Sequence, residues 1–278
     1  TPRPCSAIPR TRGARGVTVG PVPSPPSAGL HPFLDHPGVL AFAHRGGTGA
    51  WPENTLAAFR HAVGLGYRYL ETDVHLTADG AVVAFHDDSL DRLTDRTGRI
   101  ADLSWDEVSE ARVAGTQPVP LLAELLDEFP EAGINIDPKH DAVVEPLARV
   151  LRDAGALRRV CIGAFSDRRI QRCRELLGSG LCTSAGPRAV GRFRLANFGL
   201  PLPSPPWRCL QVPVRAGGMR LVDRRFIDSA HRRSLQVHVW TVNDPAEMHD
   251  LLDLGVDGIM TDQLAVLRDV LIQRGAWA

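Results

Sequence analysis

Short β-rich runs alternate with amphipathic helical stretches from Gly38 to Asp262, and this alternation limits the possible folds more than any other feature of the chain. The β-rich runs cover residues 39–47, 69–76, 81–86, 134–137, 159–165, 180–185, 209–214, 236–242 and 257–262. Helical patterns fill most of the intervals, at 52–65, 105–114, 121–129, 142–154, 167–177, 223–233 and 245–254. The alternation predicts a parallel sheet with helical crossovers, and its length favours a closed (β/α)8 TIM barrel over an open sheet.

The expected barrel is irregular near its second and third strands. Nine β-rich runs are one more than a barrel of this kind needs, and residues 77–80 join two of the runs as a tight turn without a helix. We therefore expect a rim strand or an irregular crossover at this place. Residues 31–278 contain no internal repeat and are expected to form one domain.

Residues 1–30 differ from the rest of the chain. They contain seven prolines, four arginines and no acidic residue, and they have no apolar run of the length that a signal peptide needs. We interpret them as a disordered arm without function, or as untranslated sequence ahead of a later start. No later segment has an apolar run long enough to span a membrane, so we expect a soluble, cytoplasmic protein.

Charge and cysteine usage narrow the classes of function. The formal net charge is +0 and the pI is about 7.1, so no overall basic field favours nucleic acid or an anionic membrane as a partner. The five cysteines include no C-x-x-C pair, and we interpret them as reduced thiols, most of them in the core, rather than as a disulfide framework or a zinc site. They are Cys5, Cys161, Cys173, Cys182 and Cys209.

Three carboxylates fall at strand ends, where barrel active sites form. Glu71 and Asp73 are two residues apart, which places both on one face of a strand, and Asp137 ends another strand. An inward-facing pair of carboxylates is costly unless a cation lies between them. Oxygen ligands without cysteine favour Mg²⁺, Ca²⁺ or Mn²⁺ over zinc. The alternative is that Glu71 or Asp73 faces outwards to an arginine.

His44 and His86 end the first and third β-rich runs and are the candidate general acid and base. Histidine is the side chain whose unperturbed pKa makes both protonation states available near neutral pH. A pair of histidines can divide the two proton transfers of a hydrolysis. For a single histidine at a strand end, a hydrogen-bonded core residue is an equal alternative.

Arg45 is a candidate phosphate ligand, and Lys139 is a notable residue at another strand end. Arg45 precedes Gly46 and Gly47, whose small size lets a phosphate approach the backbone, although an ion pair with a nearby carboxylate is the alternative. Lys139 is the only lysine among 32 basic residues and follows Asp137 by two positions. Trp240 lies near the end of the run at 236–242.

Several motifs together resemble the glycerophosphodiester phosphodiesterase family, from His44 to Asp262. They occur in the family's order: HRGG (44–47), PENT (52–55), ETDVHLTADG (71–80), VVAFHDD (82–88), INIDPK (134–139), VHVWTVND (237–244) and GVDGIMTD (255–262). The resemblance implies a (β/α)8 barrel, irregular around strands 2 and 3, that cleaves glycerophosphodiesters to sn-glycerol 3-phosphate and an alcohol with a divalent cation. It also implies roles for the candidate residues: His44 and His86 as the acid–base pair, Glu71, Asp73 and Asp137 as metal ligands, Arg45 and Lys139 at the phosphate, and Trp240 in the pocket wall.

Two features depart from the family pattern. Many members have glutamate where this chain has Asp137, which shortens the ligand by one methylene. The cap insertion that is usual between barrel elements is reduced to a segment within residues 88–120. A smaller cap predicts a more open pocket.

Two other functions are considered. A lysophospholipase D would need an apolar pocket wall. Residues 193–207 (FRLANFGLPLPSPPW) are able to supply one, and the alternative for them is an ordinary Pro-rich loop. A non-catalytic barrel that binds phosphodiesters or a protein would be expected to have lost a histidine or a metal ligand, and every key position is retained. No motif favours nucleic acid, nucleotide or redox cofactors.

Overall fold

The computed structural model describes residues 30–197 and 204–277. Its centre is a barrel of eight parallel strands in the order β8-β7-β6-β2-β1-β13-β12-β9, and a parallel bridge between Ser184 and Cys209 connects the two end strands. The (β/α)8 prediction is confirmed. The strands are β1 (Leu40–His44), β2 (Tyr69–Leu76), β6 (Gly133–Pro138), β7 (Val160–Ile162), β8 (Cys182–Thr183), β9 (Cys209–Pro213), β12 (Gln236–Trp240) and β13 (Gly258–Thr261).

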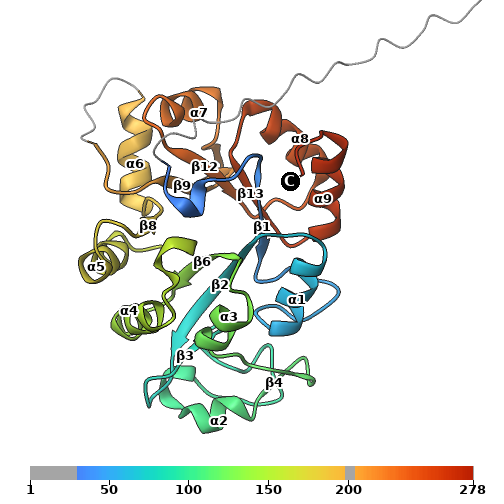
Figure 1. The fold of residues 1–278 in the computed structure, drawn as a ribbon, viewed down its shortest axis with the longest axis vertical. Coiled ribbons are helices and arrows are strands. Elements are labelled where there is room, and N and C mark those ends of the chain that lie inside the picture. Colours follow the sequence, from blue (N-terminus) through green and yellow to red (C-terminus); the bar gives the residue numbers. More distant parts are fainter. Residues whose placement is uncertain (1–29, 198–203, 278) are drawn as a thin grey trace, which may run out of the picture.

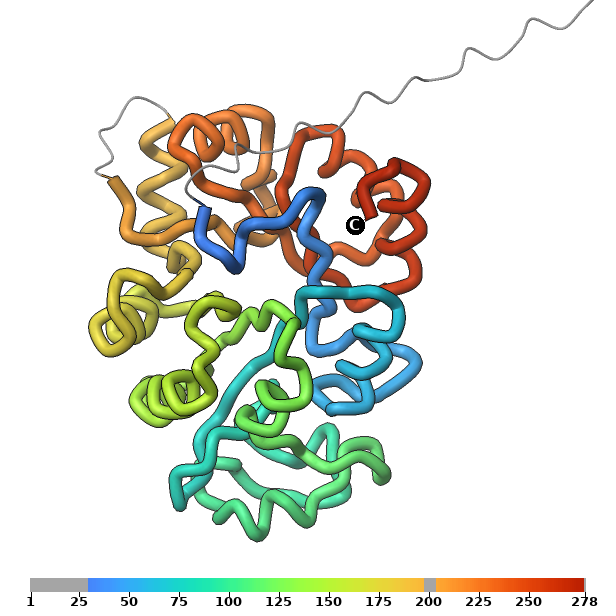
Figure 2. Tube along the Cα trace, in the orientation of Figure 1, coloured from blue at the N-terminus to red at the C-terminus, as the bar shows by residue number. Residues whose placement is uncertain are grey.

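Helices surround the barrel and cover the outward faces of its strands (Figures 1 and 2). Each helix turns an apolar stripe inwards, as α4 does with Val144, Leu147 and Leu151. The helices are α1 (Leu56–Gly64), α3 (Leu122–Glu128), α4 (Val144–Asp153), α5 (Asp167–Leu177), α6 (Pro187–Ala196), α7 (Arg224–His231), α8 (Pro245–Leu254) and α9 (Leu264–Gln273). None of the helices among the described residues has both the length and the apolar character that crossing a bilayer requires.

Helix α6 was not predicted, because the sequence between the β-rich runs at 180–185 and 209–214 is rich in Pro and Gly and was interpreted as an irregular connection. In the structure Pro187 occupies the first turn, and Phe193 and Ala196 are buried. Helix α9, after the last predicted strand, was also not predicted.

The expected irregularity lies after β2. Strand β3 (Val82–Ala84) pairs antiparallel with β2 and is the extra strand. Beyond it the chain forms a small insertion with its own apolar cluster, which includes Phe85, Leu90 and Ile100. The insertion is made of η2 (Ile100–Asp102), α2 (Trp105–Ser109), β4 (Arg112–Val113) and β5 (Gln117–Pro118), and Figure 1 shows it below the barrel. The short segment at 88–120 therefore folds as a compact unit beside the barrel.

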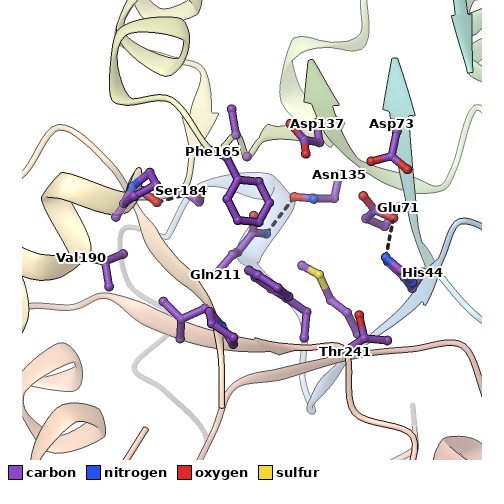
Figure 3. A pocket seen from close by; sticks show the side chains of 18 of the residues that line it. His44, Glu71, Asp73, Asn135, Asp137, Phe165, Ser184, Val190, Gln211 and Thr241 are labelled. Atoms are coloured by element: carbon purple, nitrogen blue, oxygen red, sulfur yellow. Dashed lines mark hydrogen bonds and ion pairs between the residues drawn. The ribbon is translucent and has the colours of Figure 1, made fainter. Parts of the chain in front are cut away.

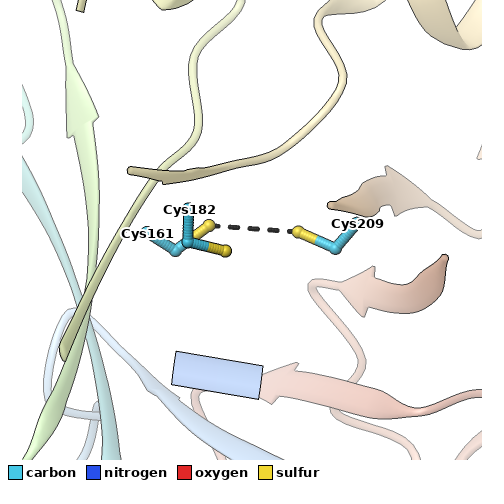
Figure 4. Close-up of side chains that lie close together, drawn as sticks. All are labelled: Cys161, Cys182 and Cys209. Carbon is cyan, nitrogen blue, oxygen red and sulfur yellow. Dashed lines mark hydrogen bonds between the residues drawn. The ribbon is translucent and has the colours of Figure 1, made fainter. Parts of the chain in front are cut away.

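The short helix η1 (Pro32–Leu34) covers the amino-terminal end of the barrel strands, opposite the carboxyl ends, and its Phe33 and Leu34 are buried. In the same apolar cluster, Cys161, Cys182 and Cys209 point towards one another from three neighbouring strands (Figure 4). Their three sulfur atoms all lie within 4.8 Å of one another. Their thiols are free and buried. The sequence predicted core thiols but not their meeting, which depends on the register of three strands. Cys5 and the predicted arm at 1–30, except for Leu30, lie outside the described residues.

Candidate active site

A pocket of about 450 Å³ lies at the carboxyl ends of the barrel strands. Its lining divides into two halves, which Figure 3 shows on opposite sides. The charged half contains His44, Arg45, Glu71, Asp73, His86, Asp137 and Lys139. The apolar half contains Phe165, Val190, Val212, Pro213, Leu221 and Trp240. The structure therefore brings all eight predicted site residues into one pocket.

Strand register brings the three carboxylates together. Asp73 on β2 is the direct partner of Asp137 on β6, and Glu71 on β2 is the partner of His44 on β1. Because these positions share the inward face, all three carboxylates point into the barrel and are buried. The alternative that Glu71 or Asp73 faces outwards is wrong.

Two cations already lie beside Asp73. The Lys139 Nζ is 2.5 Å from Asp73 Oδ1 and 2.9 Å from Asp137 Oδ2, and the Arg45 Nε is 3.1 Å from Asp73 Oδ2. Burial alone would raise the pKa of Asp73, but Lys139 and Arg45 outweigh it and hold that pKa below its usual value. The expected alternative for Arg45, an ion pair with a carboxylate, is therefore present in this pocket.

The other two carboxylates are less well satisfied. The Oδ1 atom of Asp137 is buried and has no hydrogen-bond partner among the described residues. Burial and the nearby Asp73 raise the pKa of Glu71 to about 7. A cation at this position would satisfy Asp137 and stabilise the charged form of Glu71. The donors are all oxygens, so the residues present fit a hard divalent ion.

A carboxylate orients His44. Its Nδ1 is 2.6 Å from Asp262 Oδ1, and the Asn243 Nδ2 donates to the other oxygen of Asp262 at 3.0 Å. The Nε2 of His44 lies 3.8 Å from Glu71 Oε2, on the side of the pocket. Burial lowers the pKa of His44, but the hydrogen bond that His44 donates to Asp262 and the charge of Glu71 outweigh burial, so the net shift is upwards.

A carboxylate orients His86 in the same way. Its Nδ1 is 2.7 Å from Asp87 Oδ1, and the Nε of Arg92 is 2.6 Å from Asp87 Oδ2. The hydrogen bond from Arg92 keeps the pKa of Asp87 far below its usual value. The His86 side chain is about twice as exposed as that of His44, at 33% against 17%. The two histidines therefore have matched partners but different access to solvent.

Sequence reasoning did not assign roles to Asp262, Asp87 or Arg92. Asp262 and Asp87 stand inside the motifs GIMTD and FHDD, directly after strands, so their position was a usable signal. The helical pattern expected from residue 52 begins at Leu56, and of the motif at 52–55 only Thr55 caps the helix. Glu53 pairs with Arg45 at 3.0 Å, and Asn54 donates to Asp73 at 3.3 Å.

His238 lies beneath the pocket in a buried chain of hydrogen bonds. Its Nε2 is 3.0 Å from Gln236 Oε1, and its Nδ1 is 3.4 Å from Gln211 Nε2, which also donates to Asn135 at 2.7 Å. Burial lowers its pKa to about 4, so the ring is neutral. It is a hydrogen-bonded core residue that supports Gln211 and Asn135 in the pocket floor.

The apolar half comes from other segments than those predicted. Phe193 and Trp207, in the segment that was considered as a possible wall, pack in the core instead. Residues 198–203 of that segment lie outside the described residues. The wall is formed by Phe165 after β7, Val190 on α6 and the end of β9. Trp240 lies there as predicted, with its ring 5.5 Å from that of Phe165.

Comparison with known proteins identifies the family. The model of the glycerophosphoryl diester phosphodiesterase family matches residues 44–266. The chain belongs to this family. It is 41% identical over 254 residues to the "Probable glycerophosphodiester phosphodiesterase 2" of Mycobacterium tuberculosis, covering 88% of this chain and 95% of that protein. It is 30% identical over 267 residues to the human lysophospholipase D GDPD1, covering 82% and 85% of the two chains.

Solved structures show the same fold. A crystal structure from Silicibacter pomeroyi superposes with a TM-score of 0.72 at 25% identity, covering 87% of this chain and 97% of the other. A phosphodiesterase from Oleispira antarctica, solved with the product sn-glycerol-3-phosphate, gives a TM-score of 0.70 at 22% identity, covering 84% and 97%.

Proposed function

We propose that this protein hydrolyses glycerophosphodiesters to sn-glycerol 3-phosphate and an alcohol with the help of one divalent cation, Mg²⁺ or Ca²⁺, with Mn²⁺ as a further candidate. The observation that carries the proposal is the pair of histidines. Each has its Nδ1 engaged by a carboxylate, and a cluster of three carboxylates and Lys139 lies in the same pocket. This arrangement provides two proton-transfer groups beside a phosphate-sized charged site.

The cation would be held by Glu71, Asp73 and Asp137, and when bound it would stabilise negative charge on the phosphate. Lys139 and Arg45 lie next to these carboxylates and add positive charge for the ester oxygens. An ammonium group is compact and an arginine is wide and planar. A second guanidinium beside Arg45 would crowd the pocket, which gives the single lysine of the chain a reason to be retained.

The histidines would move the protons of the reaction. With Nδ1 held by Asp262 or Asp87, each ring presents Nε2 as its exchanging atom. One histidine takes the proton of the nucleophile as the phosphorus–oxygen bond forms. The other gives a proton to the alkoxide as the second phosphorus–oxygen bond breaks. The nucleophile is water, or the neighbouring glycerol hydroxyl if the reaction passes through a cyclic phosphate.

A second candidate is a lysophospholipase D activity on the same site. The specific observation is the apolar half of the pocket, where Phe165, Val190 and Leu221 face the charged half. This wall suits an acyl chain better than choline or ethanolamine alone. The human relative that is named a lysophospholipase D supports this candidate.

We also propose that the protein works in the cytoplasm, because the four described cysteines are free thiols. Alkylation followed by mass spectrometry of the native protein should find these thiols reactive only after unfolding. A native disulfide among them would contradict this location.

The proposed activity is tested by measuring release of glycerol 3-phosphate from glycerophosphocholine and glycerophosphoethanolamine. Assays contain Mg²⁺, Mn²⁺ or Ca²⁺ in turn, and EDTA in a further arm. We expect activity that needs a metal and is lost in His44→Gln, while His61→Gln, on helix α1, stays active. Folded protein that releases no glycerol 3-phosphate with any metal would overturn the proposal. Release from lysophosphatidylcholine alone would favour the second candidate.

A further inference from the structure

Large hydrophobic side chains are exposed on the face of the barrel that holds the pocket. Trp51 follows β1 and is 45% exposed, Phe165 follows β7 and is 69% exposed, and Met219 follows β9 and is 76% exposed. Loops that follow the strands of a parallel barrel all emerge at the same end. The three side chains therefore share one face, although they come from distant parts of the sequence.

Two of these side chains, Phe165 and Met219, stand at the rim of the pocket mouth. Phe165 itself lines the pocket, and so do Ala216 and Leu221, which flank Met219. Met219 belongs to a short hairpin of β10 (Arg215–Ala216) and β11 (Met219–Arg220). Its turn residues, Gly217 and Gly218, have φ of 56° and 80°, which a tight hairpin turn requires and glycine adopts without strain. The hairpin thus holds an exposed methionine at the pocket mouth.

The same part of the rim is basic. Arg188 and Arg192 on α6 and Arg215 on the hairpin are exposed, and none of the three forms an ion pair with another described residue. The segments 185–197 and 213–222 contain no acidic residue. The nearby Asp167 accepts hydrogen bonds from the backbone N–H groups of Arg188 and Ala189. The chain has no net charge, so this is a local concentration of positive charge.

We propose that this rim docks the protein on an anionic lipid surface, with the mouth of the pocket facing the headgroups. Exposed aromatic and methionine side chains beside unpaired arginines combine the two attractions that hold peripheral proteins at membranes, apolar insertion and charge. The purpose of the docking, delivery of lipid-derived phosphodiesters to the pocket, rests on the proposed function. The docking itself does not, because it needs neither the histidines nor the carboxylates.

The test is co-sedimentation of the full chain with vesicles of phosphatidylcholine, with and without phosphatidylglycerol. We expect binding that requires phosphatidylglycerol and weakens with salt. Met219→Asp should reduce the binding constant by about tenfold or more, and Arg215→Glu by about fivefold or more. The matched controls are Ile272→Asp, an exposed apolar residue on α9, and Arg158→Glu on the opposite face. Both should bind like the wild type.

Three outcomes would overturn the proposal. They are no binding to vesicles with phosphatidylglycerol, equal losses in the control variants, or a dimer in sedimentation velocity that Met219→Asp disperses, since the rim would then be an interface between copies. Hydrolysis of soluble glycerophosphocholine is measured on the same preparations and should be unchanged in Met219→Asp. Vesicle binding without hydrolysis would refute the proposed function alone, and hydrolysis without vesicle binding would refute the docking alone.

Discussion

The two halves of the pocket are built differently. In the charged half, most polar atoms are fixed by partners: Asp73 by Lys139 and Arg45, and the two histidines by Asp262 and Asp87. In the apolar half, Phe165 is 69% exposed and contacts Trp240 through a single ring edge. Fixed groups suit the chemistry that every substrate shares, whereas a loosely bounded wall suits leaving groups of several sizes. We infer that one half carries the reaction and the other selects the alcohol.

The largest effect is expected for His44→Gln. It should lower kcat by about 10²–10⁴ for glycerophosphocholine and lysophosphatidylcholine alike, because the proton transfer is common to both. Steady-state kinetics with both substrates check this, with His61→Gln as the control. A loss confined to one substrate would break the division between the two halves.

Asp137→Asn should weaken binding of the divalent cation by about 100-fold or more, since loss of even an outer partner of a metal site costs up to this factor. Titration of free Mn²⁺ by electron paramagnetic resonance gives the affinity without reference to activity. Asp141→Asn, which changes an exposed carboxylate just beyond the strand, is the control. Equal affinity in wild type and Asp137→Asn would place the cation elsewhere.

Val190→Glu should reduce kcat/KM for lysophosphatidylcholine by about tenfold or more, because it puts a carboxylate in the wall that would face the acyl chain. The kcat for glycerophosphocholine should stay within about twofold of the wild type if the wall takes no part in the chemistry. Leu195→Glu, at an exposed position of the same helix, should change neither value. Equal losses for both substrates would show that the halves are not separate.

The smallest change is expected for Asp262→Asn, which should move one limb of the pH–rate profile. The hydrogen bond that Asp262 accepts from His44 helps raise the pKa of His44, so its loss should shift the limb that His44 governs to lower pH. If His44 is the base, the acidic limb moves, and if it is the acid, the alkaline limb moves. A profile whose limbs both stay in place would mean that Asp262 does not set the protonation of His44.

The charged half was predictable and the apolar half was not, for physical reasons. The i, i+2 spacing of Glu71 and Asp73 fixes their common face. Asp137 and the two histidines end predicted β-rich runs, where barrel sites form. Asp262 acts on His44 across 218 positions of sequence, and their meeting requires the pairing of β1 with β13.

The apolar wall depends on contacts that carry no local pattern. Val190 lies on a helix whose arginines hide its periodicity, and Phe165 looks in the sequence like the end of a buried strand. Phe193 and Trp207 read equally well as a pocket wall or as core, and only packing shows that they are core. The meeting of three cysteines beneath the pocket likewise depends on strand register.

The division between the halves is tested most directly by one paired measurement. The ratio of kcat/KM for lysophosphatidylcholine to that for glycerophosphocholine is determined for wild type, His44→Gln and Val190→Glu. We predict the wild-type ratio in His44→Gln despite its large loss of rate, and a ratio about tenfold lower in Val190→Glu. A changed ratio in His44→Gln, or an unchanged one in Val190→Glu, would contradict this assignment of chemistry and selectivity to opposite halves of the pocket.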